Sequence, residues 1–188
     1  MTTLLIGLSL FFLLHFVPVY ANGTRNKVAS KIGELPYKGL FALASLAGLY
    51  LVYKGWTTST PTQLYSLPAW AFHATGLFVL IGFVLFFAAR APTNIKRVVR
   101  HPQLTGVVFW AIGHLLVNGD TRSFALFGGF TVWALLTMFG ANRRDGEWKK
   151  PEKVGFVKDA ITVAIGVALY VVFVVWAHEW LFGMKPMG

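Results

Sequence analysis

The segment from 69 to 89 reads AWAFHATGLFVLIGFVLFFAA and contains no charged residue. A run of about 18 or more apolar residues is long enough to cross the hydrocarbon core of a bilayer, which is roughly 30 Å thick. The part from 78 to 87 has no polar side, whereas a helix of a soluble bundle would need one. The segment therefore predicts a membrane-spanning helix.

The rest of the chain repeats this pattern of apolar runs separated by short polar clusters. Only 13% of the 188 residues are charged, against about 25% in a typical soluble domain. We predict an all-α integral membrane bundle of about six transmembrane helices, forming a single domain over residues 1–188. The predicted spans are 3–21, 39–53, 69–89, 103–117, 123–141 and 158–182. The first lacks a basic start, so we expect a retained helix and not a signal peptide.

The distribution of basic residues predicts the orientation of these spans. Fourteen of the 17 Lys and Arg residues fall in the first, third and fifth loops, and the other three are Lys54, Arg122 and Lys185. Since Lys and Arg are enriched in cytoplasmic loops, both termini are expected on the outer, periplasmic side of a bacterial inner membrane. The net charge of +10 lies in loops, so anionic lipid headgroups are the expected partner and nucleic acid is not.

The chain has no cysteine. This excludes disulfides, thiolate catalysis, iron–sulfur clusters, cysteine-ligated zinc and covalently attached haem. The titratable side chains within the predicted spans are instead imidazoles, from His15, His73, His114 and His178. No carboxylate or Lys or Arg lies deep within a span, which argues against an ion-coupled transporter.

Imidazoles without carboxylates suit haem b, which needs one or two axial histidines in an apolar, aromatic pocket. Zinc would want three or four ligands. Aromatic residues lie within two turns of His15 or His114, namely Phe11, Phe12, Phe16, Phe109 and Trp110. Each histidine can equally be a packing residue that is hydrogen-bonded to a backbone carbonyl, and His178 reads most simply as an interfacial residue.

Depth in the membrane leaves the choice of haem ligands open. His15 lies about 9 Å from the inner interface and His114 about 5 Å from the outer one, at 1.5 Å per residue. Two ligands of one iron need nearly equal depth. His73 lies at almost the same depth as His114, so His73 is the alternative metal ligand.

The densest motif surrounds the short fourth span. It reads RHPQLTG from 100 to 106 and WAIGHLLVNGD from 110 to 120. The run Asn118-Gly119-Asp120 is a turn signal. At the cytoplasmic end, Arg97, Arg100 and His101 are candidates to pair with haem propionates or with lipid headgroups.

These two stretches, together with Leu14-His15-Phe16, the length and the six-span layout, resemble the NnrU family. The family is associated with nitrite and nitric oxide reduction in denitrifying bacteria. It is similar to the 15-cis-zeta-carotene isomerase of plants and cyanobacteria, a membrane enzyme that contains haem b. The resemblance implies that His15 and His114 occupy the positions of the haem ligands, and that His101 matches a His-Pro histidine. The isomerases carry a cysteine one turn before the second ligand, where this chain has Ala111.

Three functional hypotheses follow. The first is a haem b protein of redox character with a redox partner, linked to nitrite and nitric oxide metabolism. The second is a haem-dependent cis–trans isomerase of a carotenoid or another lipophilic polyene, which requires an apolar, lipid-facing cavity beside the iron. The third is a membrane transporter or an assembly scaffold for denitrification, without catalytic activity.

Overall fold

The computed structural model describes residues 1–186, and these residues form helices without a β-strand. Five helical segments are long and apolar enough to cross a membrane: Thr2–Tyr20, Glu34–Thr58, Trp70–Ala88, Thr121–Asp145 and Phe156–Phe182. This confirms the all-α, multi-span class of fold. The last two residues of the predicted domain, 187 and 188, lie outside the described part.

The first half of the chain contains the helices α1 (Thr2–Tyr20), α2 (Asn22–Ile32), α3 (Glu34–Thr58), α4 (Trp70–Ala88) and η1 (Asn94–Arg97). The second half contains α5 (Pro102–Leu115), α6 (Thr121–Ser123), η2 (Phe124–Gly128), α7 (Gly129–Asp145), α8 (Phe156–Val172), η3 (Phe173–Ala177) and α9 (His178–Phe182). The segments η2 and η3 are π-helical turns inside otherwise continuous helices.

The helices differ from the predicted spans in two regions of the chain. The first predicted loop contains the helix α2, and α3 begins at Glu34 instead of residue 39. The fourth predicted span corresponds to α5, which has 14 residues. At 1.5 Å per residue α5 is about 21 Å long, which is shorter than a hydrocarbon core of roughly 30 Å.

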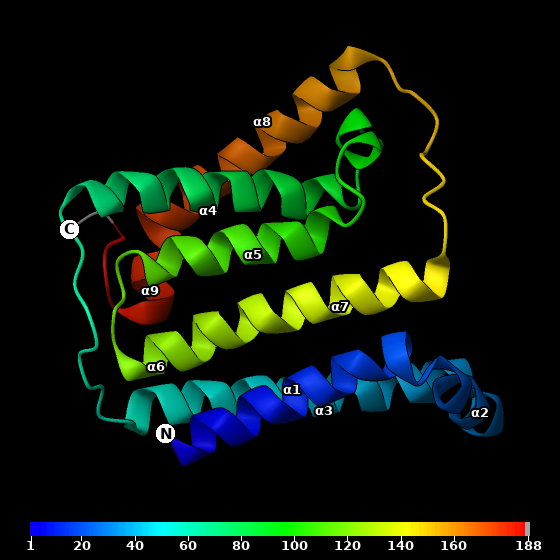
Figure 1. Cartoon of the computed structure of the whole chain (residues 1–188), viewed down its shortest axis with the longest axis horizontal. Coiled ribbons are helices and arrows are strands. Elements are labelled where there is room, and N and C mark those ends of the chain that lie inside the picture. The colour runs from blue at the N-terminus through cyan, green and yellow to red at the C-terminus, as the bar shows by residue number, and fades with distance from the viewer. Residues whose placement is uncertain (187–188) are drawn as a thin grey trace.

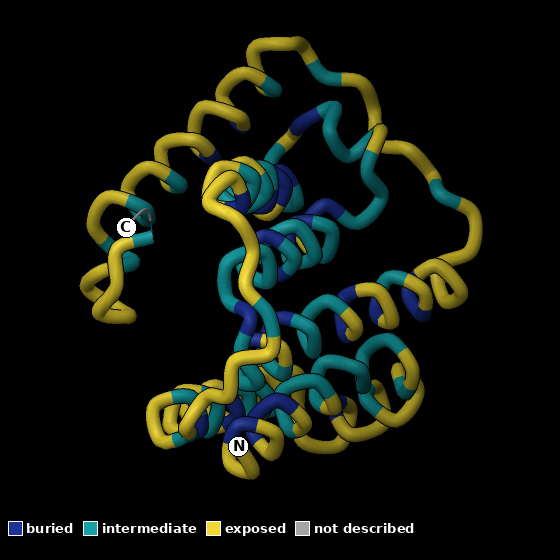
Figure 2. Tube along the Cα trace, turned by 60° about the vertical axis from the view of Figure 1, so that its left-hand side comes forward, coloured by how far each residue is buried: buried dark blue, intermediate teal, exposed yellow. Residues whose placement is uncertain are grey.

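The long helices stand in a row and do not form a closed bundle (Figure 1). Along this row α3 packs on α1, α1 on α7, α7 on α5, α5 on α4, and α4 on α8. The helix α7 therefore lies between the pair α1–α3 and the pair α4–α5. Figure 2 shows α8, at the end of the row, exposed along most of its length.

Small residues set the spacing of neighbouring helices, as expected where lipid supplies no hydrophobic drive for association. The tightest part of the α4–α5 contact pairs Gly82 with Gly106. A Cβ on Gly106 would lie 2.7 Å from the carbonyl oxygen of Gly82, and one on Gly82 would lie 2.9 Å from that of Gly106. Neither position has room for a larger residue.

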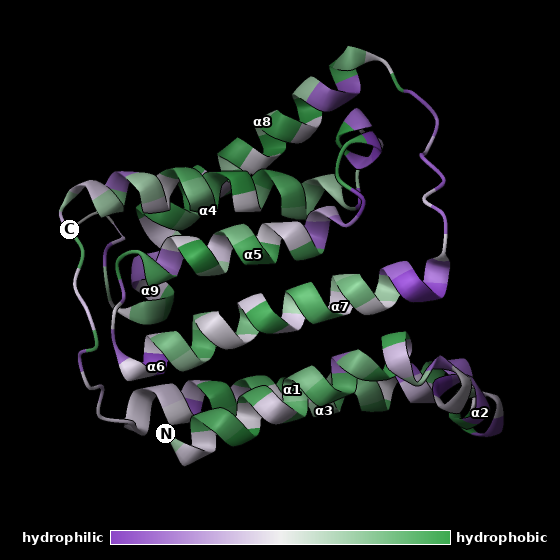
Figure 3. Ribbon diagram, viewed as in Figure 1, coloured by the Kyte–Doolittle hydropathy of each residue, from purple (hydrophilic) through white to green (hydrophobic). Residues whose placement is uncertain are grey.

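Three polar segments gather at one end of the helices. Figure 3 shows hydrophilic colour on α2, on the last turn of α7 and on the loop that joins α7 to α8, all on the right-hand side. These segments belong to the predicted first and fifth loops, which carry ten of the 17 basic residues. The fold therefore brings charge that is distant in sequence to one end of the helices.

Candidate functional site

His15 has one ring nitrogen fixed and one free. Its Nδ1 lies 2.7 Å from the carbonyl oxygen of Phe11, one turn earlier in α1. Because a carbonyl only accepts, Nδ1 must donate its hydrogen, and the lone pair of the neutral ring is left on Nε2. No hydrogen bond engages Nε2 from any of residues 1–186. The rings of Phe11 and Phe41 lie against His15, with centroids 4.0 Å and 5.0 Å away.

His114 repeats this arrangement on α5. Its Nδ1 lies 2.8 Å from the carbonyl oxygen of Trp110, again one turn earlier. The ring of Phe127 stacks on His114 at 4.6 Å, and the ring of Trp110 lies 5.1 Å away. Histidines that bind metals almost always donate their second N–H in this way, because the bond fixes the tautomer and the orientation of the ring.

An aromatic cluster connects the two histidines. We define it as Phe11, Phe12, Trp110, Phe127, Phe130 and Trp133. Phe130 lies at its centre, with centroid distances of 5.6 Å to Phe11 and 5.7 Å to Trp110. Ring contacts therefore lead from His15 to His114 without a break in the described structure.

The sequence identified half of this cluster. Of the aromatic residues expected near the histidines, Phe11, Phe12 and Trp110 belong to it. Phe16 instead contacts Tyr20, and Phe109 contacts Phe78. Three members that sequence reasoning missed, Phe127, Phe130 and Trp133, come from η2 and α7. These residues are spaced three apart, which places them along one side of a helix. That spacing was the feature of the sequence that could have identified them.

Trp133 carries an unsatisfied donor inside the cluster. The residue is 9% exposed, and its indole Nε1 has no hydrogen-bond partner among the described residues. A buried N–H without a partner costs about 1–3 kcal/mol. The ring of Trp133 lies edge-on to His15 at 5.9 Å, so this tryptophan belongs to the same site as His15.

The donor set fits haem b in its chemistry. Two neutral imidazoles with free Nε2 atoms and an aromatic surround are what an axially ligated haem requires. Phe130 touches the rings beside both histidines, so a porphyrin that reaches both requires Phe130 to move aside. Among residues 1–186, no three His, Asp or Glu side chains gather as ligands of a bare metal ion.

A polar turn closes the C-terminal end of α5, next to His114. Asn118 Nδ2 donates to the carbonyl oxygen of His114 at 2.9 Å, and the Tyr65 hydroxyl donates to that of Leu115 at 2.6 Å. The backbone N–H of Leu64 donates to the Gly119 carbonyl at 2.7 Å. A Cβ on Gly119 would overlap the carbonyl oxygen of Tyr65, so this close approach requires glycine.

Asp120 ends this turn and starts the next helix. Its carboxylate accepts hydrogen bonds from the backbone N–H of Arg122 at 2.9 Å and from the hydroxyl of Ser123 at 2.6 Å. Burial alone would raise the pKa of Asp120, but the hydrogen bonds from Ser123 and Arg122, with the charge of Arg122, hold it below its ordinary value of 3.8. The predicted turn at 118–120 is thus an N-cap.

The basic candidates lie at the opposite end of the helices. His101 Nε2 donates to Asn142 Oδ1 of α7 at 2.8 Å. Arg100 donates to the carbonyl oxygen of Gly146 at 2.8 Å, and Arg97 donates to that of Pro151. Arg100 and His101, but not Arg97, border a hollow of about 560 Å³, whose lining consists of Lys96, Arg100, His101, Asp145, Glu147, Trp148, Lys149 and Pro151. No described contact joins these residues to His15 or His114.

Asp159 is a polar residue that sequence reasoning missed. It lies in the first turn of α8 and accepts hydrogen bonds from Thr93 Oγ1 at 2.6 Å and from the backbone N–H and the side-chain amide of Asn94 at 2.7 Å and 2.6 Å. The carboxylate therefore fastens α8 to the loop after α4. In the sequence, the only indication of this contact was that Asp159 is a lone acidic residue at the start of the last apolar run.

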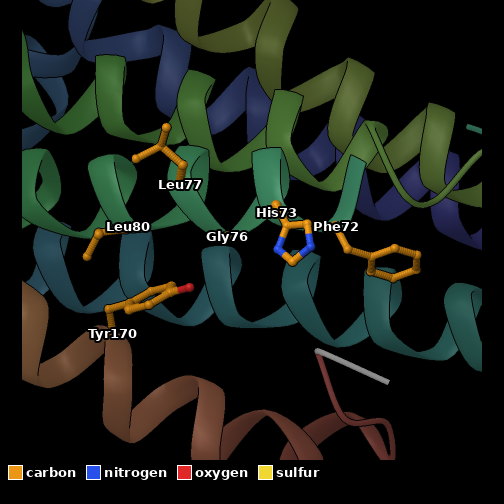
Figure 4. Close-up of a pocket in the computed structure, with 6 residues that line it drawn as sticks. All are labelled: Phe72, His73, Gly76, Leu77, Leu80 and Tyr170. Carbon is orange, nitrogen blue, oxygen red and sulfur yellow. The ribbon is translucent and has the colours of Figure 1, made fainter. Parts of the chain in front are cut away.

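His73 lies apart from the aromatic cluster. Two residues further along α4, Thr75 faces α5 and donates to the carbonyl oxygen of Gly113 at 2.8 Å. Since residues two apart point to nearly opposite sides of a helix, His73 faces away from α5. Figure 4 shows its ring on the side of α4 that faces α8. His178 Nδ1 donates to the carbonyl oxygen of Met184 at 2.8 Å.

Comparisons with known proteins give one match. A family model described as NnrU protein matches residues 3–186, nearly the whole chain. No curated protein and no solved structure matches.

Proposed function

The chain belongs to the NnrU family, and from this premise we propose that it is a haem b-binding membrane protein of redox character, linked to nitrite and nitric oxide metabolism. One observation carries the proposal. His15 and His114 lie in the same aromatic cluster, and each donates Nδ1–H to the carbonyl one turn earlier while Nε2 stays free. The shared arrangement, together with the shared aromatic cluster, supports a common role as ligands for these two histidines.

In this proposal His15 and His114 hold the iron, and haem b when bound supplies a reversible one-electron centre. The carbonyl groups of Phe11 and Trp110 keep both imidazoles in the tautomer that presents a lone pair on Nε2. The stacked ring of Phe127 limits rotation of His114. The aromatic cluster excludes water from the site.

The redox function has more support than the isomerase alternative. Ala111, one turn before His114, is fully buried and offers no thiol. A polyene isomerase also requires a lipid-facing cavity beside the iron. The described groove that faces lipid is lined by His73 and Tyr170, on the side of α4 away from His114.

We also infer six membrane crossings, with α5 as a short one, and both termini on the periplasmic side of a bacterial inner membrane. The support is the grouping of α2, the end of α7 and the α7–α8 loop at one end of the helices. Basic segments favour the cytoplasmic side.

The test is a visible absorption spectrum of the detergent-purified protein beside four variants. We expect a Soret band in the wild type and loss of most of it in His15→Ala and in His114→Ala. The matched controls are His73→Ala and His178→Ala, which remove an imidazole outside the aromatic cluster and should keep the band. Size-exclusion chromatography on each variant identifies misfolded protein.

Two results would overturn the assignment. A wild type without a Soret band after supplementation with haem would remove haem from the function. A band retained in His15→Ala but lost in His73→Ala would move the ligand pair to His73 and His114.

A further inference from the structure

A groove runs between the first turns of α4 and the last turn of α8. Its volume is about 440 Å³, and its lining consists of Phe72, His73, Gly76, Leu77, Leu80 and Tyr170. Phe72 and Leu77 are 50% and 57% exposed, so the groove opens sideways toward lipid. In size it falls within the range of small-molecule sites, about 300–1,000 Å³.

Two polar groups stand in this apolar lining. Figure 4 shows the imidazole of His73 at one end of the groove, and the hydroxyl of Tyr170 pointing along it toward Gly76 and His73. Neither side chain makes a hydrogen bond to any of residues 1–186. In hydrocarbon each unsatisfied polar group costs several kcal/mol, so both groups favour a ligand with oxygen acceptors.

The depth of the groove narrows the choice of ligand. His73 is three residues from the start of α4, about 5 Å below the outer interface at 1.5 Å per residue. The ring of Tyr170 contacts the ring of Phe83, with centroids 6.0 Å apart. Phe83 is ten residues after His73 on α4, which places it about 15 Å deeper in the membrane than His73. The groove therefore lies inside the hydrocarbon, below the level of phospholipid headgroups.

The chemistry then selects one class of molecule. An acyl chain or a hydrocarbon polyene brings no acceptor, and a charged headgroup does not enter hydrocarbon readily. A quinone brings ring carbonyls as acceptors, a flat ring that suits the aromatic faces of Phe72 and Tyr170, and an apolar tail that remains in lipid. Entry from the side needs no opening of the helices.

We propose that this groove binds an isoprenoid quinone, with His73 and Tyr170 as donors to its carbonyl oxygens. The proposal concerns binding and stands independently of haem, because none of the lining residues belongs to the aromatic cluster. It also gives His73 a role that haem ligation does not.

The test is equilibrium binding of decylubiquinone to the full-length protein in nanodiscs, measured by quenching of tryptophan fluorescence. Each neutral hydrogen bond contributes about 0.5–1.5 kcal/mol, so we expect His73→Ala and Tyr170→Phe each to raise the Kd about 2- to 10-fold. Gly76→Leu fills the groove and should abolish binding. Tyr50→Phe removes a hydroxyl from the exposed part of α3 and should leave the Kd unchanged.

The thermal midpoint and the size-exclusion profile of every variant provide the check on folding. Unchanged affinity in the folded double variant His73→Ala/Tyr170→Phe would overturn the proposal. Equal binding of decylbenzene, which has the tail and the ring but no carbonyl, would also overturn it, because the groove would then hold only an apolar chain.

Discussion

His114 and His73 belong to neighbouring helices and were expected at the same depth, yet their surroundings differ. His114 is held by a carbonyl and a stacked ring and is closed off by a polar turn. His73 borders an open groove without a hydrogen-bond partner in the described chain. In our two proposals the functions of these imidazoles differ because each occupies a different side of its helix. Depth alone does not distinguish a metal ligand from a donor to a lipophile.

The largest expected difference between the two regions is in packing. Phe127 is 6% exposed and stacks on His114, whereas Phe72 is 50% exposed in the groove. We expect Phe127→Ala to lower the free energy of unfolding by about 3–4 kcal/mol through the cavity it leaves, and Phe72→Ala by about 1 kcal/mol or less. Unfolding by SDS titration measures both. Equal losses would mean that the groove is as closed as the cluster.

The next largest expected effect is at the contact between α4 and α5, where Gly106 packs against Gly82. In Gly106→Ala the new Cβ would meet the backbone of Gly82, which cannot give way. We expect a loss of about 1–3 kcal/mol from overpacking. At Gly128 a Cβ would have no atom within 4 Å, so Gly128→Ala should be neutral or stabilising by up to about 1 kcal/mol. Thermal unfolding in detergent compares the two, and equal midpoints would contradict the tight crossing.

A smaller effect depends on pH, through the cap that closes the turn next to His114. Asp120→Ala should cost about 1–2 kcal/mol at neutral pH, as loss of an N-cap does. Because the folded-state pKa of Asp120 is lowered, its contribution is complete above the unfolded value and is lost as pH falls through the lower folded value. Unfolding measured from pH 7 to pH 3 should therefore show the wild type converging on the variant only below about pH 4.

The smallest expected effect comes from removing the hydroxyl of Thr75, which joins α4 to α5 by a hydrogen bond. Thr75→Val removes its bond to Gly113 and should cost about 0.5–1 kcal/mol. Thr131→Val is the control, because that hydroxyl binds only the Phe127 carbonyl of its own helix. SDS unfolding of both variants beside the wild type measures the two losses of unfolding free energy. A larger loss in Thr131→Val than in Thr75→Val would contradict a stabilising contact between α4 and α5 through Thr75.

The sequence predicted the helices well because apolar length is a direct requirement of the bilayer. It did not predict α2, whose residues from Asn22 to Ile32 are mostly polar and read as a loop. Contacts outside α2 help to hold it. Arg25 pairs with Glu34 at 2.7 Å and lies over the ring of Tyr37.

The site was harder to predict than the fold, for a physical reason. Lipid is as apolar as the protein interior, so the spans are apolar on all sides and no pattern shows which side faces a neighbour. The sequence therefore gave His15, His114 and Trp110 as candidates but left His73 open as the alternative metal ligand. It also gave no sign of the π-helical turn that carries Phe127.

The position of α7 between the two helix pairs determines when the cluster can form during synthesis. The pairs α1–α3 and α4–α5 consist of segments that leave the ribosome early and can associate as they enter the membrane. The rings of Phe127, Phe130 and Trp133 arrive afterwards, and α7 must then take its place between two existing hairpins. A nascent chain that ends before α7 would have both candidate ligands without the aromatic rings that join them, so insertion of the proposed haem would have to wait for the final third of translation.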